Sequence, residues 1–426
     1  MRPSRRAFLR QTFLSLGAMG TLPVLTRCGS ADMDTGPVGD GYFPPYNPPV
    51  ITPPTVSNFG NLGPLGEPDA LGLRLPPGFS ARVVARSTDV VEGTDHAWHT
   101  APDGGACFLA EDGGYVYVSN SEAVLNAGVS ALRFDAEGNL VAAYPILSGT
   151  RVNCAGGPTP WGTWLSCEET STGQVYECDP FGVVDALVRP ALGVFKHEAV
   201  AVDPVHGHLY LTEDESDGRF YRFLPDRLVD GRPDLSSGTL QVMQVLDGEE
   251  GPVQWFALPD PSATELATRD QVPASTVFDG GEGIVWHEGV VFFTTKGDNR
   301  VWAFDTNTET LSIIYDRDTS DNPILSGVDN LWVTPAGDLL VAEDGGDMQI
   351  VVITPDGALR PLVQVTGQDD SDHGSGPRPL SSAPLLQLAA RAVRQRLRHR
   401  RSHLRDHRAL LPDLTARGPQ ATGPSG

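Results

Sequence analysis

The feature that most constrains the fold is a repeated cadence of short apolar runs and glycine turns between residues 79 and 365. Each unit has an acid-containing entry, an apolar run, a Gly turn, a second apolar run and often an acidic exit. The order is clear in residues 197–214 and recurs in 101–122, 281–295 and 329–344. Such runs, with almost no helical periodicity, predict β-strands. Because the units recur about every 40–60 residues, we expect an all-β protein, a β-propeller with about six blades.

The acidic residues of these units are expected to meet. Corresponding strand ends of successive propeller blades converge around one axis, so the entry and exit acids should converge too. Close carboxylates repel one another and are costly to bury, and a cluster of them normally binds cations. Asp-Gly and Asn-Gly pairs also form ordinary turns, which is the role we expect for most exposed Asp residues. The pattern predicts a carboxylate-rich central site.

The charge distribution supports the same interpretation. The formal net charge of −23 argues against binding to nucleic acid, which requires neutralisation of phosphates. Residues 29–377 hold 16 basic and 52 acidic residues, a net charge of −36, because the other basic residues lie near the two ends. The body of the protein is therefore more acidic than the total indicates.

Residues 1–30 have the pattern of a twin-arginine signal peptide, with Arg5-Arg6 ahead of the mildly apolar run 13–24. That run is too short for a transmembrane helix. We expect export by the twin-arginine translocase to the periplasm or the cell exterior, with or without a lipid anchor at Cys28. Residues 31–76 are rich in Gly and Pro and predict a linker, and the propeller is expected over 77–370.

The strand cadence stops near residue 365, and residues 371–426 form a basic tail expected to have little order. Residues 391–408 could form a basic helix that binds a membrane or nucleic acid, but the acidic body disfavours this. We prefer the hypothesis that the tail is coding sequence read out of frame. The last blade would then be incomplete and the propeller open at that point.

The five cysteines fit no zinc-ribbon spacing. Cys167 and Cys178 could pair in an oxidising periplasm. Cys154 is set apart as a candidate ligand, because of the segment in which it lies.

That segment, Asn153 to Glu169 (NCAGGPTPWGTWLSCEE), resembles the hallmark of the PhoX-type alkaline phosphatases. Lys196-His197-Glu198, residues 211–214 and residues 329–331 follow in the family's order, so the resemblance spans about residues 75–365. It implies a six-bladed propeller, exported by the twin-arginine route, in which central iron and calcium ions act on small phosphate esters.

The resemblance also implies a set of metal ligands. It matches Cys154 and Glu198 to iron ligands, Glu169 to a carboxylate on the calcium side, and Glu282 and Asp329 to later metal ligands. A thiolate suits iron and hard carboxylate oxygens suit calcium. Weaker candidates are the other acids of the repeats, namely Glu122, Glu213, Asp214 and Asp344.

Several residues of these motifs also have ordinary structural interpretations. Cys154 could be a small buried residue or a disulfide partner, and His197 could orient Glu198, line the site or serve only the fold. No catalytic residue beyond the metal cluster is assigned. Side chains alternate along a strand, so only one of Glu168 and Glu169 should face the centre. Residues expected to serve the fold are Trp161, Trp164, His96 and His99.

Three departures from the family pattern limit the functional prediction. Gly280 stands two residues before Glu282, where the family has an arginine that can grip phosphate. Ser121 replaces a histidine, and the chain is shorter than the well-known phosphatases. The first hypothesis is an exported metal-dependent hydrolase of phosphate monoesters. The alternatives are a catalytically silent calcium-binding propeller or interaction module, and a lactonase-like calcium propeller, which the cysteine motif disfavours.

Overall fold

The computed structural model describes residue 57 and residues 59–366, all within the first of two compact units of the chain. Their regular structure is β-strand except for two single-turn 3-10 helices, η2 (Pro190–Leu192) and η3 (Thr268–Asp270). The prediction of an all-β protein is confirmed.

The strands form antiparallel sheets of four, four, nine and five strands and a two-stranded hairpin. The nine-stranded sheet is joined in its middle by a pairing of only two residues, Gly251 with Leu311 and Pro252 with Thr310. We divide it there and call the resulting groups blades 1 to 5 in chain order. Blades 1 and 2 are β2 (Pro102–Leu109), β3 (Tyr115–Ser121), β4 (Ala127–Phe134) and β5 (Leu140–Thr150), then β6 (Asn153–Pro158), β7 (Trp164–Glu168), β8 (Val175–Cys178) and β9 (Leu187–Val188). Blade 3 is β10 (His197–Asp203), β11 (His208–Glu213), β12 (Phe220–Pro225), β15 (Gly238–Val245) and β16 (Gly251–Ala257), with the small hairpin β13 (Leu228–Val229) and β14 (Arg232–Pro233) beside it. Blades 4 and 5 are β17 (Gly281–His287), β18 (Val290–Thr295), β19 (Arg300–Asp305) and β20 (Thr310–Asp316), then β21 (Val328–Val333), β22 (Leu339–Glu343), β23 (Gln349–Ile353) and β24 (Leu359–Val365).

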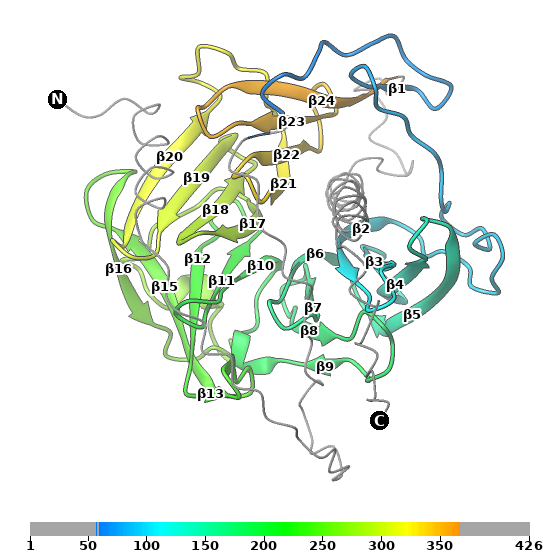
Figure 1. Cartoon of the computed structure of the whole chain (residues 1–426). Helices are drawn as coiled ribbons and strands as arrows, with labels where there is room; N and C mark the ends of the chain where they lie inside the picture. The colour runs from blue at the N-terminus through cyan, green and yellow to red at the C-terminus, as the bar shows by residue number, and fades with distance from the viewer. Residues whose placement is uncertain (1–56, 58, 367–426) are drawn as a thin grey trace, which may run out of the picture. The chain divides into compact units, whose positions relative to one another are not determined.

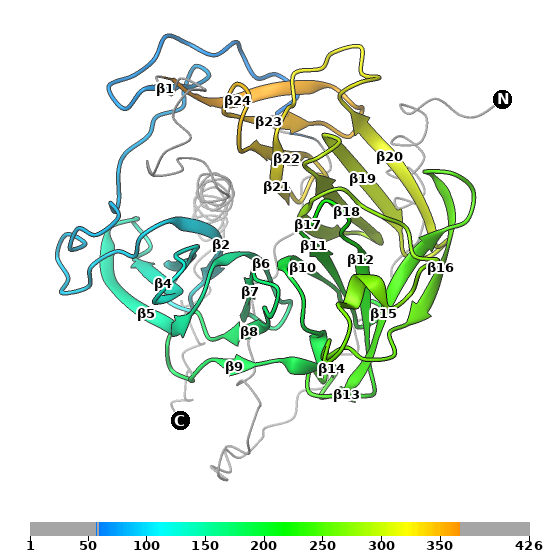
Figure 2. The same ribbon diagram turned by 180° about the vertical axis from the view of Figure 1, so that it is seen from behind.

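The first strand of every blade lies at the centre (Figure 1). These inner strands, β2, β6, β10, β17 and β21, contact one another in that order. Figures 1 and 2 show no sheet of the described residues between blade 5 and blade 1, although Trp332 of β21 packs against the apolar cluster of blade 1. The propeller fold is thus confirmed, with five blades in the described residues, and the segment after residue 366 lies outside them.

The blades are held together by four apolar clusters between neighbouring sheets. Between blades 3 and 4, Phe220 stacks on Phe293 with ring centroids 4.4 Å apart, and Trp302 stacks on the same Phe293 at 5.9 Å. Phe293 is fully buried, and truncating such a residue to alanine costs about 3–5 kcal/mol. The alternating apolar residues of the cadence therefore supply the inter-blade core.

The described fold begins ahead of residue 77, inside the stretch expected to be a linker. Strand β1 (Leu73–Arg74) pairs with β24 and extends blade 5 at its outer edge. The Arg74 guanidinium also donates to Gln364 Oε1 at 3.0 Å. The glycines and prolines on both sides of these residues, such as Gly72, Pro76 and Pro77, indicated a linker and obscured this two-residue strand.

The pairing considered for Cys167 and Cys178 does not form, since both are free thiols in the structure. Cys167 lies opposite Val175 and belongs to the cluster between blades 2 and 3, whereas Cys178 lies opposite Trp164 and faces blade 1. The two side chains therefore belong to different cores. Cys154 is a free thiol as well.

Several predictions lie outside the described residues: the signal peptide of residues 1–30, the lipid anchor at Cys28 and the tail of residues 371–426. Within residues 57–366, the structure contains no helix of the length and apolarity needed to cross a membrane.

Candidate metal centre

Every inner strand is irregular at the same place. The pairing register with the second strand of the blade shifts once near the start of each inner strand, and a shift of this kind re-aims the local side chains. The second residue of each inner strand lies at this irregularity. We call these five residues the inner set: Asp103, Cys154, Glu198, Glu282 and Asp329.

A second set of residues follows the second strand of every blade. The backbone N–H of each such residue donates to a carbonyl oxygen in its own blade, over 2.8–3.2 Å. The acceptor is always the residue two positions before the inner-set residue, as Gly327, before Asp329, accepts from Asp344. The equivalence holds in all five blades. We call these residues the rim set: Glu122, Glu169, Asp214, Lys296 and Asp344.

The two sets surround one small cavity of about 40 Å³. All members except Glu122 line it. The structure thus brings together all five principal predicted ligands, Cys154, Glu169, Glu198, Glu282 and Asp329, with the weaker candidates Asp214 and Asp344. A larger cavity of about 300 Å³ lies further along the same strands, but its lining is mainly apolar and holds none of the predicted ligands.

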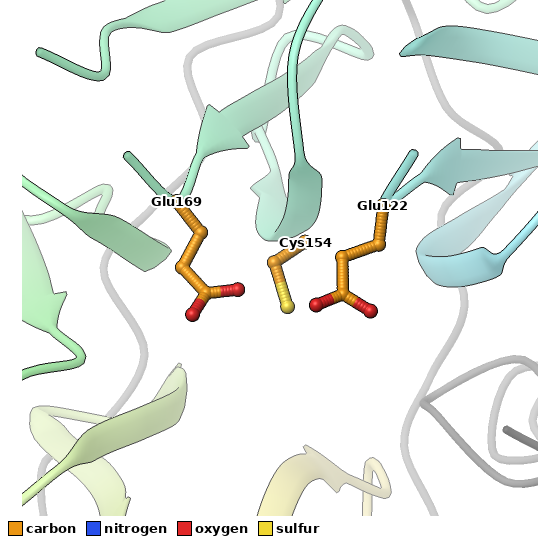
Figure 3. Close-up of side chains that lie close together, drawn as sticks. All are labelled: Glu122, Cys154 and Glu169. Atoms are coloured by element: carbon orange, nitrogen blue, oxygen red, sulfur yellow. The ribbon is translucent and has the colours of Figure 1, made fainter. Parts of the chain in front are cut away.

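Within the centre, the ligand atoms form two groups of three. Glu122, Cys154 and Glu169 each offer one atom within 4.8 Å of the others. Figure 3 shows these side chains converging, with Cys154 between the two glutamates. The second group, with the same spacing, consists of Glu198, Glu282 and Asp329. Glu198 therefore groups with carboxylates rather than with the thiol.

Glu198 provides a test of whether these residues suit a cation. Its side chain is fully buried, and neither carboxylate oxygen has a hydrogen-bond partner among the described residues. Burying a carboxylate without a partner is costly, so such a group takes up either a proton or a cation. The position of Glu282 and Asp329 beside it fits a cation bound by carboxylate oxygens.

Burial dominates the electrostatics of the centre. It raises the pKa values of Glu198 and Glu282 well above the usual range, and neighbouring carboxylates raise them further. The pKa of Asp329 rises to about 6 and that of Glu169 to about 7, again mainly through burial. Burial also raises the pKa of the Cys154 thiol. Bound cations would favour the charged forms of these groups and displace their protons.

Polar side chains on the second strands position the inner set. Asn120 Nδ2 donates to the carbonyl oxygen of Cys154 at 3.1 Å, and Asn120 Oδ1 accepts from Trp164 Nε1 at 2.9 Å. In blades 3 and 4 the equivalent residues are Thr212, whose hydroxyl donates to the Glu282 carbonyl at 2.6 Å, and Thr294, whose hydroxyl donates to the Asp329 carbonyl at 2.5 Å.

Glycine allows the inner strands to approach one another. A Cβ on Gly283 would lie 2.5 Å from Leu331 N of β21, and a Cβ on Gly104 would lie 2.5 Å from Ala155 Cα of β6. Real Cβ atoms do not approach a backbone so closely, so any larger residue would force the strands apart. Since Gly283 follows Glu282 directly, this contact sets the separation of neighbouring ligands.

The centre includes two residues that the sequence interpretation missed. Asp103 is buried, and its carboxylate accepts from Gly104 N at 2.6 Å. The sequence could have revealed Asp103, because it lies at the entry of the first repeat, the position that Glu198 occupies in its own repeat. Lys296 was missed because a lysine is not a metal ligand. Its ammonium lies 2.8 Å from Asp344 and 3.8 Å from Glu282.

Two of the suggested residues lie away from the cavity. Glu213 is buried behind it, accepting from the Tyr221 hydroxyl at 2.7 Å and pairing with Arg269 at 3.3 Å. His197 is fully buried against Phe195, with Nε2 3.1 Å from the Gly193 carbonyl, and burial lowers its pKa to about 3. Each of the two directly precedes a residue that does line the cavity.

The other motif residues serve the fold. Glu168 accepts backbone N–H groups from Arg151 and Gln174, and Trp161 Nε1 donates to Glu177 at 2.7 Å. His96 and His99 lie near serine hydroxyls of blade 1. Two residues depart from the family pattern. The Ser121 hydroxyl donates to the Thr100 carbonyl at 2.7 Å, and Gly280 has a left-handed backbone with φ of 67°.

Comparisons with known proteins identify a family model and several similar structures. The family model for alkaline phosphatase PhoX matches residues 126–180 and 171–316, which include Cys154, Glu169, Glu198 and Glu282. No curated protein matches the chain. Among solved structures, PhoX from Pseudomonas fluorescens in complex with vanadate, a transition state analogue, is similar with a TM-score of 0.57 and 16% identity, over 71% of this chain and 88% of that one. A gluconolactonase from Xanthomonas campestris has a TM-score of 0.35 and 16% identity, over 72% and 89% of the two chains.

Proposed function

The chain belongs to the PhoX-type alkaline phosphatase family, and from this premise we propose that it hydrolyses phosphate monoesters at the inner and rim sets, using bound cations. The observation that carries the proposal is the buried and unpartnered carboxylate of Glu198 beside Glu282 and Asp329. An acidic cavity without cations would repel a phosphate ester, so a phosphatase built on these residues depends on metal.

The two ligand groups suit different ions. Glu122, Cys154 and Glu169 offer one thiol and two carboxylates. We assign this set to iron, because a thiolate binds iron in preference to calcium. Glu198, Glu282 and Asp329 offer only hard oxygens, which suit calcium. Both assignments follow from the donor atoms.

Bound cations would attract the phosphoryl oxygens, offset the charge that develops in the transition state and activate an oxygen nucleophile. The chain's own residues keep the ligands in place before substrate arrives. Asn120, Thr212 and Thr294 fix the backbone of the inner set, and the irregularity in each inner strand turns its ligand toward the centre. This preorganisation limits the reorganisation needed during the reaction.

We also propose that the protein is exported by the twin-arginine route and acts in the periplasm or outside the cell. Arg5-Arg6 and the apolar run that follows support this. The route suits the metal centre, because a twin-arginine substrate crosses the membrane already folded. A lipid anchor at Cys28 remains a prediction from the sequence.

The test is hydrolysis of p-nitrophenyl phosphate by the purified protein, before and after chelation and after calcium and iron are restored. We expect activity that chelation abolishes and the two metals together restore. Glu198→Gln keeps the size of the side chain but removes its charge, and should not be restored. Bound calcium with no hydrolysis of any phosphomonoester would contradict the proposal and favour a silent calcium-binding propeller, an alternative consistent with the absence of a side chain at Gly280.

A further inference from the structure

Lys296 occupies the rim position at which the other four blades carry a carboxylate. Its backbone N–H donates to the Gly280 carbonyl at 2.8 Å, as every other rim residue does to the equivalent carbonyl of its own blade. An ammonium group cannot ligate a cation, so this position cannot serve as the other four do. We propose that Lys296 binds the anionic phosphoryl group of the substrate. This inference rests on the proposed function.

The use of lysine in this chain points the same way. Of the 31 basic residues only two are lysines, Lys196 and Lys296, and both lie beside the centre. Lys196 pairs with Glu169 at 3.0 Å and Asp214 at 3.2 Å and does not line the cavity. Lys296 does line it, as the one cationic side chain among the described lining residues.

The ammonium of Lys296 has more hydrogen-bond donors than it uses within the centre. It can donate three hydrogen bonds, and one goes to Asp344 at 2.8 Å. Glu282, at 3.8 Å, is too far for a hydrogen bond. The Lys296 side chain is 37% exposed, and Asp344 is 31% exposed. The side chain is therefore only partly buried, and its ammonium can donate its remaining hydrogens to a ligand in the cavity.

Gly280 places no side chain next to Lys296. A Cβ there would lie 3.3 Å from Asp214 Oδ1 and 3.7 Å from Lys296 Cβ, so any side chain would extend into the region next to the lysine. The left-handed backbone at Gly280 also disfavours such a residue. Because position 280 is a glycine, no side chain extends from it toward the Lys296 ammonium. A doubly charged phosphoryl group could accept its free hydrogens as charge-assisted hydrogen bonds.

The competing interpretation is that Lys296 is only a fixed counterion for Glu282 and Asp344. In that role its loss would change metal binding and leave phosphate binding unaltered once the metals are loaded. Phosphate affinity and metal content measured on the same sample therefore separate the two interpretations.

The first test uses the small number of lysines. Lysine labelled with ¹⁵N at Nζ, incorporated during expression, labels only Lys196 and Lys296 and keeps all three hydrogens of each ammonium. Lys296→Arg identifies the signal of Lys296. Inorganic phosphate added to the metal-loaded protein should shift the Lys296 signal and leave that of Lys196 in place. A shift of neither signal, or equal shifts of both, would overturn the inference.

The second test is kinetic. In metal-loaded Lys296→Gln, we expect KM for p-nitrophenyl phosphate and the inhibition constant of inorganic phosphate to rise about tenfold to a hundredfold, the usual loss for a charged hydrogen bond. Lys296→Arg should recover part of this loss. Arg227→Gln removes a charge from an exposed ion pair with Asp234 and serves as the control.

The outcomes separate failure of the inference from failure of the proposed function. Unchanged KM and phosphate inhibition in an active Lys296→Gln protein would overturn the inference and leave the phosphatase function intact. If the wild-type protein does not hydrolyse phosphomonoesters but phosphate still shifts the Lys296 signal, the anion site stands and the proposed function fails.

Discussion

Glu198 illustrates how single residues define this centre. A buried carboxylate without hydrogen-bond partners favours either a proton or a cation, and the neighbouring carboxylates make the full negative charge still more costly. Burial also raises the pKa values of Glu169 and Asp329, although Glu169 pairs with Lys196 at 3.0 Å. The residues proposed to bind metal therefore destabilise the metal-free protein wherever they lose their protons.

This gives a prediction on pH. The pKa of Glu169 is raised from 4.5 to about 7, so its folded form binds more protons than its unfolded form in that range, and stability falls as pH rises through about 7. His99 and His197 act in the opposite direction, but only below their usual pKa of 6.5. With chelator present, we expect the free energy of unfolding to fall from about pH 6.5 to about pH 8.

Urea unfolding at several pH values, with chelator and with calcium, measures this effect. Calcium should flatten the decline, because it replaces the protons of the inner set. Equal slopes under the two conditions, or stability that rises with pH in chelator, would contradict the account.

The residue scale also shows what the sequence could reveal. Acids at equivalent repeat positions predicted that Glu282 and Asp329 would meet, and a motif pointed to Cys154. For two residues adjacent in sequence, it was harder to predict which one faces the centre, because side chains alternate along a strand. Asp214 lines the cavity whereas Glu213 is buried behind it. Which member of such a pair faces the centre depends on the irregularity and end of each strand, which composition does not indicate.

At the scale of elements, the inner strands act as a common frame for the ligands. Each has an irregularity in register where its ligand leaves the strand, and glycines let adjacent strands approach. Apolar alternation predicted the strands themselves, since burial decides it. The turns into the inner strands could not be predicted in this way. Val152, directly before β6, has a left-handed φ of 45°, which is unexpected for a β-branched residue.

Gly283→Ala tests this frame. The added Cβ would meet the backbone of Asn330 and Leu331 at 2.5–2.6 Å and push β17 and β21 apart, which separates Glu282 from Asp329. We expect a loss of about 1–3 kcal/mol in the free energy of unfolding, together with weaker calcium binding.

Gly60→Ala is the matched control, because a Cβ at Gly60 meets nothing within 4 Å. Denaturant unfolding and calcium titration of both variants measure the two effects. Wild-type calcium affinity in a destabilised Gly283→Ala protein would show that the close approach serves the fold alone.

At the scale of the whole molecule, the structure shows where some of the acidic residues of the chain gather. Part of the net charge of −36 over residues 29–377 is concentrated in one cavity, where all five described blades contribute acidic residues or Cys154 as candidate ligands. The repeat length predicted a propeller, but not how its first and last blades are joined. Blades 5 and 1 have no described sheet between them, and the hypothesis of an out-of-frame tail concerns residues outside the described part (Figures 1 and 2).

The central claim is that the two sets bind cations. Crystals of the metal-loaded protein, measured above and below the iron absorption edge, test it most directly. The account predicts an iron peak bonded to Cys154 Sγ, between Glu122 and Glu169, and a cation without iron signal among Glu198, Glu282 and Asp329. Phosphatase activity in crystals that hold no metal at these residues, or metal bound only elsewhere on the chain, would contradict it.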